Sequence, residues 1–175
     1  HLAGCDLSNS EFSGANLSAA NLDQALLNQC DFTGANLSGC AMSRVSARTS
    51  DFTSANLSAS DLDGADLSAA HFVRTNLSKS NLSNCILKEA IFTRANCSQT
   101  VMHNALLHYA DFSHANLFST SFMDADLMGA NLHRVIQQKT IWMGAKLELG
   151  HAGTATANVV VNNGTLSAER SNTFG

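Results

Sequence analysis

Large apolar residues recur at every fifth position from Leu2 to Leu147. Of these thirty central positions, twenty-four carry Leu or Phe. Two residues before each of them, from Cys5 to Ala145, the residue is always Ala, Ser, Cys, Thr or Val. A helix repeats about every 3.6 residues and a strand about every two, so a strict five-residue period fits neither element. The pattern predicts a solenoid in which these two positions point inward and the other three outward.

The five-residue units resemble those of a known family. Units of the form A-(D/N)-L-x-x, such as Ala15-Asn16-Leu17-Ser18-Ala19, are similar to those of pentapeptide-repeat proteins. The resemblance extends from residue 1 to about residue 149. It implies an all-β fold, the right-handed quadrilateral β-helix, in which four units form the four sides of each coil.

A period of twenty residues supports four units per coil. The unit at 15–19 returns at 35–39, 55–59 and 75–79, and more loosely at 95–99 and 115–119. One set of central residues recurs with the same period: Phe12, Phe32, Phe52, Phe72, Phe92 and Phe112. Like residues are expected to stack from coil to coil. With coils roughly 4.8 Å apart, about seven coils would form a rod on the order of 35 Å long.

The sequence predicts a single domain followed by a tail. Residues 1–149 form the expected β-helix, and residues 150–175 are a Gly/Thr/Asn-rich tail. Within the tail, Val159 to Leu166 has the pattern of a strand, a turn and a second strand. This hairpin is expected either to cap the last coil or to belong to a linker. Because the repeat is already in register at Leu2, we expect either further chain upstream or a pairing of this edge.

Composition and charge limit the classes of function. Hydrophobic residues make up 45% of the chain but aromatic residues only 6%, which favours a narrow interior. The net charge of −4 gives no general argument for direct nucleic-acid binding. The sequence contains no run of about 18 apolar residues, so it predicts no membrane span. Residues 1–66 carry a net charge of −6 and residues 67–175 one of +2, so the rod is expected to be electrically polar.

Cysteines and histidines do not form a recognisable reactive or metal-binding motif. Cys5, Cys30, Cys40 and Cys85 occupy the small inward position and Cys97 a central one. We expect buried, reduced thiols and hence a cytoplasmic location, with a secreted effector as the alternative. The histidines His103, His108, His114 and His133 project from different columns. No cofactor, metal site or catalytic arrangement is predicted, and we expect the protein not to be an enzyme.

The charged outward columns beside the phenylalanines are the main candidates for a functional site. One column begins with Glu11, Asp31 and Asp51. The other, two residues after each central position, begins with Gly14, Gly34 and Ser54 and continues with four candidate residues: Arg74, Arg94, His114 and Arg134. Since like charges opposed across a ladder repel, this basic stripe is either a set of solvated side chains or a docking surface for an anionic partner.

Apolar residues at outward positions are further candidates for partner binding: Leu26, Ile86, Ile91, Val101 and Leu106. Near the end of the repeat, more apolar residues occupy outward positions: Phe118, Met123, Met128, Ile136, Ile141 and Met143. They are expected to pack under the final segment or to form a homodimer contact through the C-terminal coils.

Two functions agree with these features. The first is a non-enzymatic scaffold for a protein partner whose identity the sequence does not reveal; family resemblance adds the role of a bacterial effector or secretion-associated adaptor. The second, implied by the resemblance and loosely by the acidic first coils, is DNA mimicry that protects or inhibits DNA gyrase or topoisomerase IV. The small net charge and the arginine stripe argue against this alternative.

Overall fold

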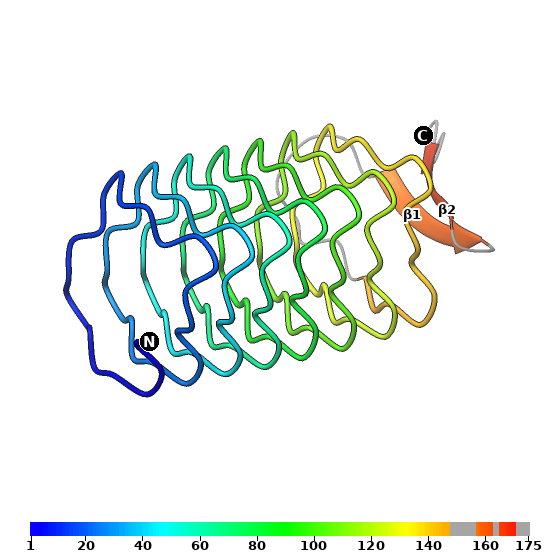
Figure 1. Cartoon of the computed structure of the whole chain (residues 1–175). Helices are drawn as coiled ribbons and strands as arrows, with labels where there is room; N and C mark the ends of the chain where they lie inside the picture. Colours follow the sequence, from blue (N-terminus) through cyan, green and yellow to red (C-terminus); the bar gives the residue numbers. More distant parts are fainter. Residues whose placement is uncertain (148–156, 163–164, 171–175) are drawn as a thin grey trace.

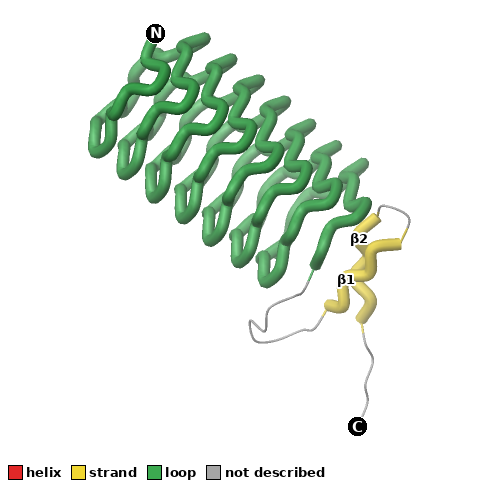
Figure 2. Tube along the Cα trace, turned by 90° about the horizontal axis from the view of Figure 1, so that it is seen from below, coloured by secondary structure: helices red, strands yellow, loops and turns green. Residues whose placement is uncertain are grey.

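The fold is a rod of stacked coils, which the computed structural model describes for residues 1–147, 157–162 and 165–170. Successive coils lie on one another along the rod from the N-terminal end (Figure 1). A view turned by 90° shows each coil repeating the outline of the preceding one (Figure 2). The solenoid predicted from the five-residue period is therefore confirmed.

Parallel bridges between residues twenty apart hold the coils together. They run from the pair Asp6 and Leu26 to the pair Asp126 and Lys146. In one such contact, the N–H of Asn36 donates to the carbonyl oxygen of Ala15 at 2.9 Å. The period of twenty residues in the sequence is thus the length of one coil. The expected number of about seven coils and the single-domain organisation stay predictions.

Each five-residue unit closes with a tight turn whose third residue is a corner. In the turn after Phe12, the N–H of Ala15 donates to the carbonyl oxygen of Phe12 at 2.9 Å, and Gly14 has a φ of 65°. A positive φ at this position alone is characteristic of a type II turn. Most corners carry residues other than glycine. These residues adopt the left-handed conformation at a cost of about 1 kcal/mol each.

The interior contains the two residue types that the pattern predicts. From Leu22 to Ala130, the central and the small positions are buried. The phenylalanine rings from Phe12 to Phe112 stack face to face, with successive centroids 4.5–5.1 Å apart and ring planes within 8°. Farther along, Trp142 is fully buried and stacks on Phe122 at 4.6 Å. Trp142 therefore belongs to the core, although it stands at a central position that usually carries Leu or Phe.

An asparagine ladder runs along the neighbouring side. Nδ2 of Asn36 donates to Oδ1 of Asn16 at 3.3 Å, and the same contact continues at 3.1–3.4 Å through four further residues: Asn56, Asn76, Asn96 and Asn116. Each Oδ1 also accepts a backbone N–H two residues later, as Asn76 does from Ser78 at 3.2 Å. These hydrogen bonds run along the axis from coil to coil, and their role is structural.

The tail contains the predicted pair of strands. β1 (Ala157–Asn162) pairs with β2 (Thr165–Arg170) in an antiparallel register that places Val161 opposite Leu166. The other residues of the tail, 150–156, 163–164 and 171–175, lie outside the described residues. The boundary near residue 149 and the role of the hairpin as a cap or as part of a linker stay predictions.

One prediction about the interior is wrong. Cys5 occupies an inward position but is exposed, because its coil is the first of the described rod and another coil covers only one of its faces. Cys30, Cys40, Cys85 and Cys97 are buried, as expected, and no disulfide links any of the five. The rod is therefore held together by ladders and stacked side chains.

Candidate interaction surface

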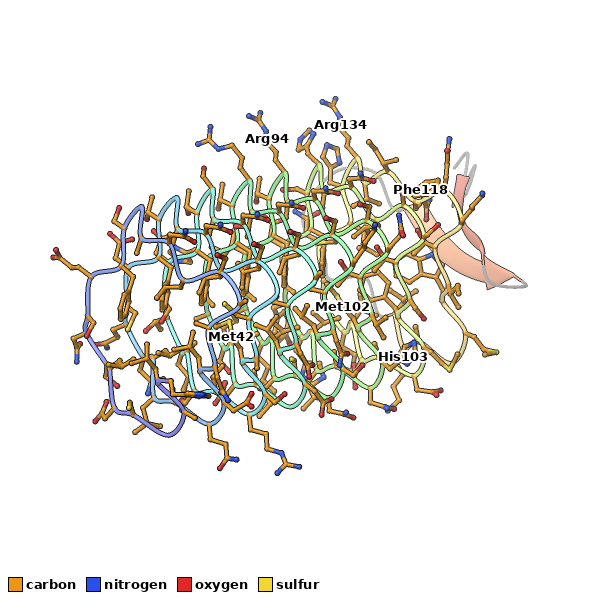
Figure 3. The ribbon with its side chains drawn as sticks, viewed as in Figure 1. Met42, Arg94, Met102, His103, Phe118 and Arg134 are labelled. Atoms are coloured by element: carbon orange, nitrogen blue, oxygen red, sulfur yellow. The ribbon has the colours of Figure 1, made fainter. Side chains whose placement is uncertain are left out.

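The corner geometry directs the arginine stripe outward. Arg74, Arg94, His114 and Arg134 all occupy corners, with φ between 56° and 60°. The backbone N–H groups of Arg74 and Arg94 each donate to a carbonyl oxygen of the following coil at 3.0 Å. Because the backbone is fixed in this way, the side chains project from the edge of the rod, as Arg94 and Arg134 do in Figure 3. We call these four residues the basic ridge.

The basic ridge is exposed, and its arginines form no ion pair with a carboxylate in the part of the chain that the structure describes. All four residues are solvent-exposed. The ion pairs among the described residues are formed elsewhere, by Arg48 with Asp66 and by His108 and Lys146 with Asp126. The only ring contact within this region joins His114 to His133 at 5.7 Å among the described residues. The guanidinium groups are therefore available to an outside anion.

The carboxylate of Asp111 contacts groups other than the arginines of the ridge. Asp111 lies on the same side of the rod as the ridge. Its Oδ2 accepts a hydrogen bond from the hydroxyl of Thr93 at 2.9 Å, and its Oδ1 accepts from the N–H of Ser113 and from Nδ2 of Asn131, both at 2.9 Å. These contacts hold the Asp111 carboxylate against the coil, and it forms no ion pair with an arginine of the ridge.

The first coils carry the opposite charge on the same side. Parallel bridges stack Glu11 on Asp31 and Asp31 on Asp51. Oδ1 of Asp31 accepts the N–H of Thr33 at 2.7 Å, and hydrogen bonds from Thr33 lower the pKa of the Asp31 carboxyl below its usual value. A lowered pKa keeps this group ionised at neutral pH. We call Glu11, Asp31 and Asp51 the acidic stripe.

The apolar candidate residues do not form one patch. Leu26, Ile86 and Leu106 lie on one side of the rod and are 36–43% exposed, and a bridge joins Ile86 directly to Leu106. Ile91 lies instead on the phenylalanine side, and Val101 on a further side. Both are only partly exposed. Ile91 and Val101 are thus less exposed than Leu106, and their role in partner binding stays a prediction.

One exposed residue near Leu106 was missed. Tyr109 is 68% exposed at a corner. The ring of Tyr109 lies over Gly129, where an added Cβ would come within 2.6 Å of ring carbons. Tyr109 is the only tyrosine of the chain and stands at a position that the repeat directs outward, which was the available signal.

The apolar residues near the end of the repeat differ in exposure. Met128, Ile136, Ile141 and Met143 are exposed, whereas Phe118 and Met123 are partly buried. Nζ of Lys139 lies 5.6 Å from the centroid of the Phe118 ring, so a cation covers part of that ring. Packing under the final segment and a homodimer contact both stay predictions, since residues 148–156 lie outside the described residues.

The titratable groups elsewhere have structural environments. Burial raises the pKa of the Cys85 and Cys97 thiols to about 12, and it also raises the pKa of Cys30 and Cys40. A thiol with a raised pKa is a poor nucleophile at neutral pH. No group of three or more His, Cys, Asp or Glu residues that could hold a metal ion occurs in the described part of the chain. Within that part there is also no helix long and apolar enough to cross a membrane.

Sequence models of the repeat match most of the chain. A model of a pentapeptide repeat region matches residues 5–82, and a model of eight pentapeptide repeats matches residues 70–108 and 95–134. The chain belongs to the pentapeptide-repeat family. The predicted resemblance is confirmed, and the fold is the right-handed quadrilateral β-helix of this family. Pentapeptide-repeat proteins are generally structural or interaction scaffolds.

Solved structures of several pentapeptide-repeat proteins are similar to the chain. HetL from the cyanobacterium Nostoc sp. strain PCC 7120, involved in the regulation of heterocyst differentiation, is 24% identical over 93% of this chain and 89% of its own, with a TM-score of 0.39. Rfr23 from the cyanobacterium Cyanothece 51142 is 34% identical over 47% of this chain and 60% of its own, with a TM-score of 0.31.

A further similar structure is that of QnrB1, a plasmid-mediated fluoroquinolone resistance protein. A trypsin-treated form is 20% identical over 83% of this chain and 88% of its own, with a TM-score of 0.32. No curated protein sequence matches the chain significantly. Because these TM-scores are low, membership of the family rests on the repeat models.

Proposed function

We propose that this pentapeptide-repeat protein is a non-enzymatic interaction scaffold that binds an acidic protein surface through the basic ridge. The observation that carries the proposal is the exposure of Arg74, Arg94 and Arg134 without an ion pair in the part of the chain that the structure describes. Unlike Arg48, which contacts Asp66 at 3.8 Å, these arginines pair with no carboxylate of the described residues.

The spacing of the ridge supports this proposal. Stacked phenylalanines beside it show that equivalent residues of successive coils lie about 5 Å apart. At this separation the like charges repel one another, so the row is unfavourable in the isolated protein. An anionic partner relieves this repulsion, and a rigid rod loses little conformational entropy on binding. The scaffold acts inside a reducing compartment or, as a secreted effector or secretion-associated adaptor, outside it.

Neutralising the ridge is expected to abolish partner binding. We expect the triple variant Arg74→Gln, Arg94→Gln and Arg134→Gln to lose the partners that the wild type captures from an extract of the source organism, as identified by mass spectrometry. Glutamine suits the corner conformation, since Gln24, Gln29 and Gln99 adopt it with φ of 58–60°. Three exposed ion pairs together account for about tenfold or more in affinity.

A matched control removes arginines from other columns. Arg44 also occupies a corner, with φ of 57°, and Arg48 lies on the side of Leu26. The double variant Arg44→Gln and Arg48→Gln is expected to capture the same partners as the wild type. An unchanged list of partners in the triple variant would contradict binding through the basic ridge.

A second candidate function is DNA mimicry toward DNA gyrase or topoisomerase IV, which the acidic stripe favours. The stacked carboxylates of Glu11, Asp31 and Asp51 form a row of negative charge on the first coils. If mimicry is the function, the protein is expected to alter gyrase supercoiling, and Glu11→Gln, Asp31→Asn and Asp51→Asn together remove the effect. Supercoiling in the presence and absence of a quinolone measures this, and no effect at micromolar protein would exclude mimicry.

A further inference from the structure

The side of the rod that carries the ridge has opposite charges at its two ends. One continuous ladder of parallel bridges runs along this side, and its members in order are Glu11, Asp31, Asp51, His71, Ile91, Asp111 and Asn131. The acidic stripe forms the first part of the ladder. Beside the last part lie the corner residues Arg94, His114 and Arg134. His71 is at the middle, with the acidic stripe before it; the half after it contains Asp111 beside the corner residues Arg94, His114 and Arg134.

The two ends also differ in shape. In the acidic part, the corner residues are Gly14, Gly34 and Ser54, and an added Cβ on either glycine would meet no atom within 4 Å. In the basic part, the same corner carries long side chains that project from the rod, as Figure 3 shows for Arg94 and Arg134. At one end of this side, the corners carry small residues next to carboxylates. At the other end, the corners carry long basic side chains that project from the rod.

We propose that the acidic surface bound by the ridge is the acidic stripe of a second copy of this chain. Two copies facing each other antiparallel, about a two-fold axis that crosses this side at His71, bring opposite ends together. Arg134 of one copy then faces Gly14 beside Glu11 of the other, and Arg94 faces Ser54 beside Asp51. In such a symmetric interface each contact occurs twice. This inference rests on the proposed function, since it uses the same ridge.

The arrangement explains why like charges are stacked in both halves. A row of carboxylates and a row of cations each raise the energy of a single copy, because like charges one coil apart repel. Antiparallel pairing places the basic ridge of each copy beside the acidic stripe of the other, and the small corners leave space for the arginine side chains. Asp111 faces Asp31 of the other copy, so this pair of like charges opposes the association. His114 of one copy faces Gly34, beside Asp31, of the other. The interface is largely charged, so its stability depends strongly on salt.

The two-fold symmetry predicts an effect of Arg74 that binding to an unrelated acidic partner does not. Arg74 lies in the same unit as His71, close to the two-fold axis, and there it faces Arg74 of the other copy. This arginine therefore opposes self-association, whereas it favours the binding of an unrelated acidic protein. Replacing Arg74 separates the two cases.

Sedimentation equilibrium of the full chain, residues 1–175, tests the pairing. The wild type is expected to approach twice its monomer mass at low salt, and raising the salt from about 0.1 M to about 1 M, which shortens the Debye length from about 10 Å to about 3 Å, weakens association at least tenfold. The variant Arg74→Gln is expected to associate as well as the wild type or better. A monomeric wild type at every concentration would overturn the inference.

A charge exchange makes the test independent of any single variant's stability. One variant carries Arg94→Glu and Arg134→Glu, and the other carries Glu11→Lys and Asp51→Lys. Each is expected to be monomeric alone, because its facing charges are alike, and the two are expected to form a mixed dimer when combined. A dimer that persists in either variant alone, or two folded variants that do not combine, would overturn the pairing.

The result also separates this inference from the proposed function. If the wild type is monomeric but captures an acidic protein that the Arg74, Arg94 and Arg134 triple variant loses, the scaffold function stands and the second copy is excluded. If the wild type pairs as described and Arg74→Gln does not weaken it, the second copy is the partner of the ridge.

Discussion

Phe72→Ala is expected to destabilise the rod by about 3–5 kcal/mol, the usual cost of removing a buried phenylalanine side chain. The Phe72 ring is fully buried and stacks between Phe52, at a centroid distance of 5.1 Å, and Phe92, at 4.9 Å. Alanine removes both stacking contacts and leaves a cavity between two coils. The coils cannot close over it without breaking the backbone ladder at His71, so relaxation recovers little of the loss.

Urea unfolding followed by circular dichroism measures this change, and two variants calibrate it. Phe72→Leu is expected to cost much less, because Leu132 already occupies the same column near the end of the rod. Phe12→Ala is also expected to cost less, since Phe12 is only partly buried and stacks on one neighbour, Phe32. Equal losses for Phe12→Ala and Phe72→Ala would contradict the stacked core.

The coil architecture could be predicted because every coil repeats the same spacing of small and central inward residues. A small residue such as Ala55 and a central residue such as Phe52 recur at fixed spacing, and only stacking with a twenty-residue period brings their copies together. The asparagine ladder followed from the same register. Such nearest-neighbour contacts depend on the repeat alone, which is why sequence reasoning was sufficient for them.

Exposure and pairing of particular side chains could not be predicted in the same way. The spacing places Ile91 outward as firmly as Leu106, but only Leu106 is among the exposed residues, because coverage depends on the neighbouring side chains of adjacent coils. Asp111 stands on the same side of the rod as the ridge, where its position in the sequence would allow a partial counter-charge. Its oxygens instead accept hydrogen bonds from Thr93, Ser113 and Asn131, a choice that depends on rotamers rather than on spacing.

The position of the candidate surface was therefore predictable from the sequence, but the ion pairing of its side chains was not. The corner column of Arg74, Arg94, His114 and Arg134 is visible in the sequence, and the structure places all four residues on one exposed edge. That its arginines lack ion pairs within the described residues required the geometry of every neighbouring carboxylate. The change from glycine at Gly14 to arginine at Arg134 is visible in the sequence, whereas the corner conformation that both residues share required the backbone.

Ala55→Leu is expected to be the most damaging change that adds atoms, with a loss of stability of about 1–3 kcal/mol or more. Ala55 is 1% exposed and points into the coil, and its N–H donates to the carbonyl oxygen of Phe52 at 2.9 Å. The hydroxyl of Thr75, in the following coil, donates to the same carbonyl oxygen at 2.6 Å. A leucine side chain has to separate these coils, and it therefore disrupts both hydrogen bonds.

Thermal and urea unfolding of three variants test this interpretation. Ala55→Thr is expected to be tolerated, because Thr75 fills the equivalent position of the next coil with its hydroxyl bonded to a carbonyl oxygen. Ser58→Leu adds the same apolar side chain at an outward position, where the equivalent residue of a later coil is Phe118, and is expected to change stability little. If Ala55→Leu unfolds like Ser58→Leu, the small position does not face the interior. A large loss in Ala55→Leu alone would instead show that the narrow space between coils, rather than hydrophobicity, selects the small residues of every unit.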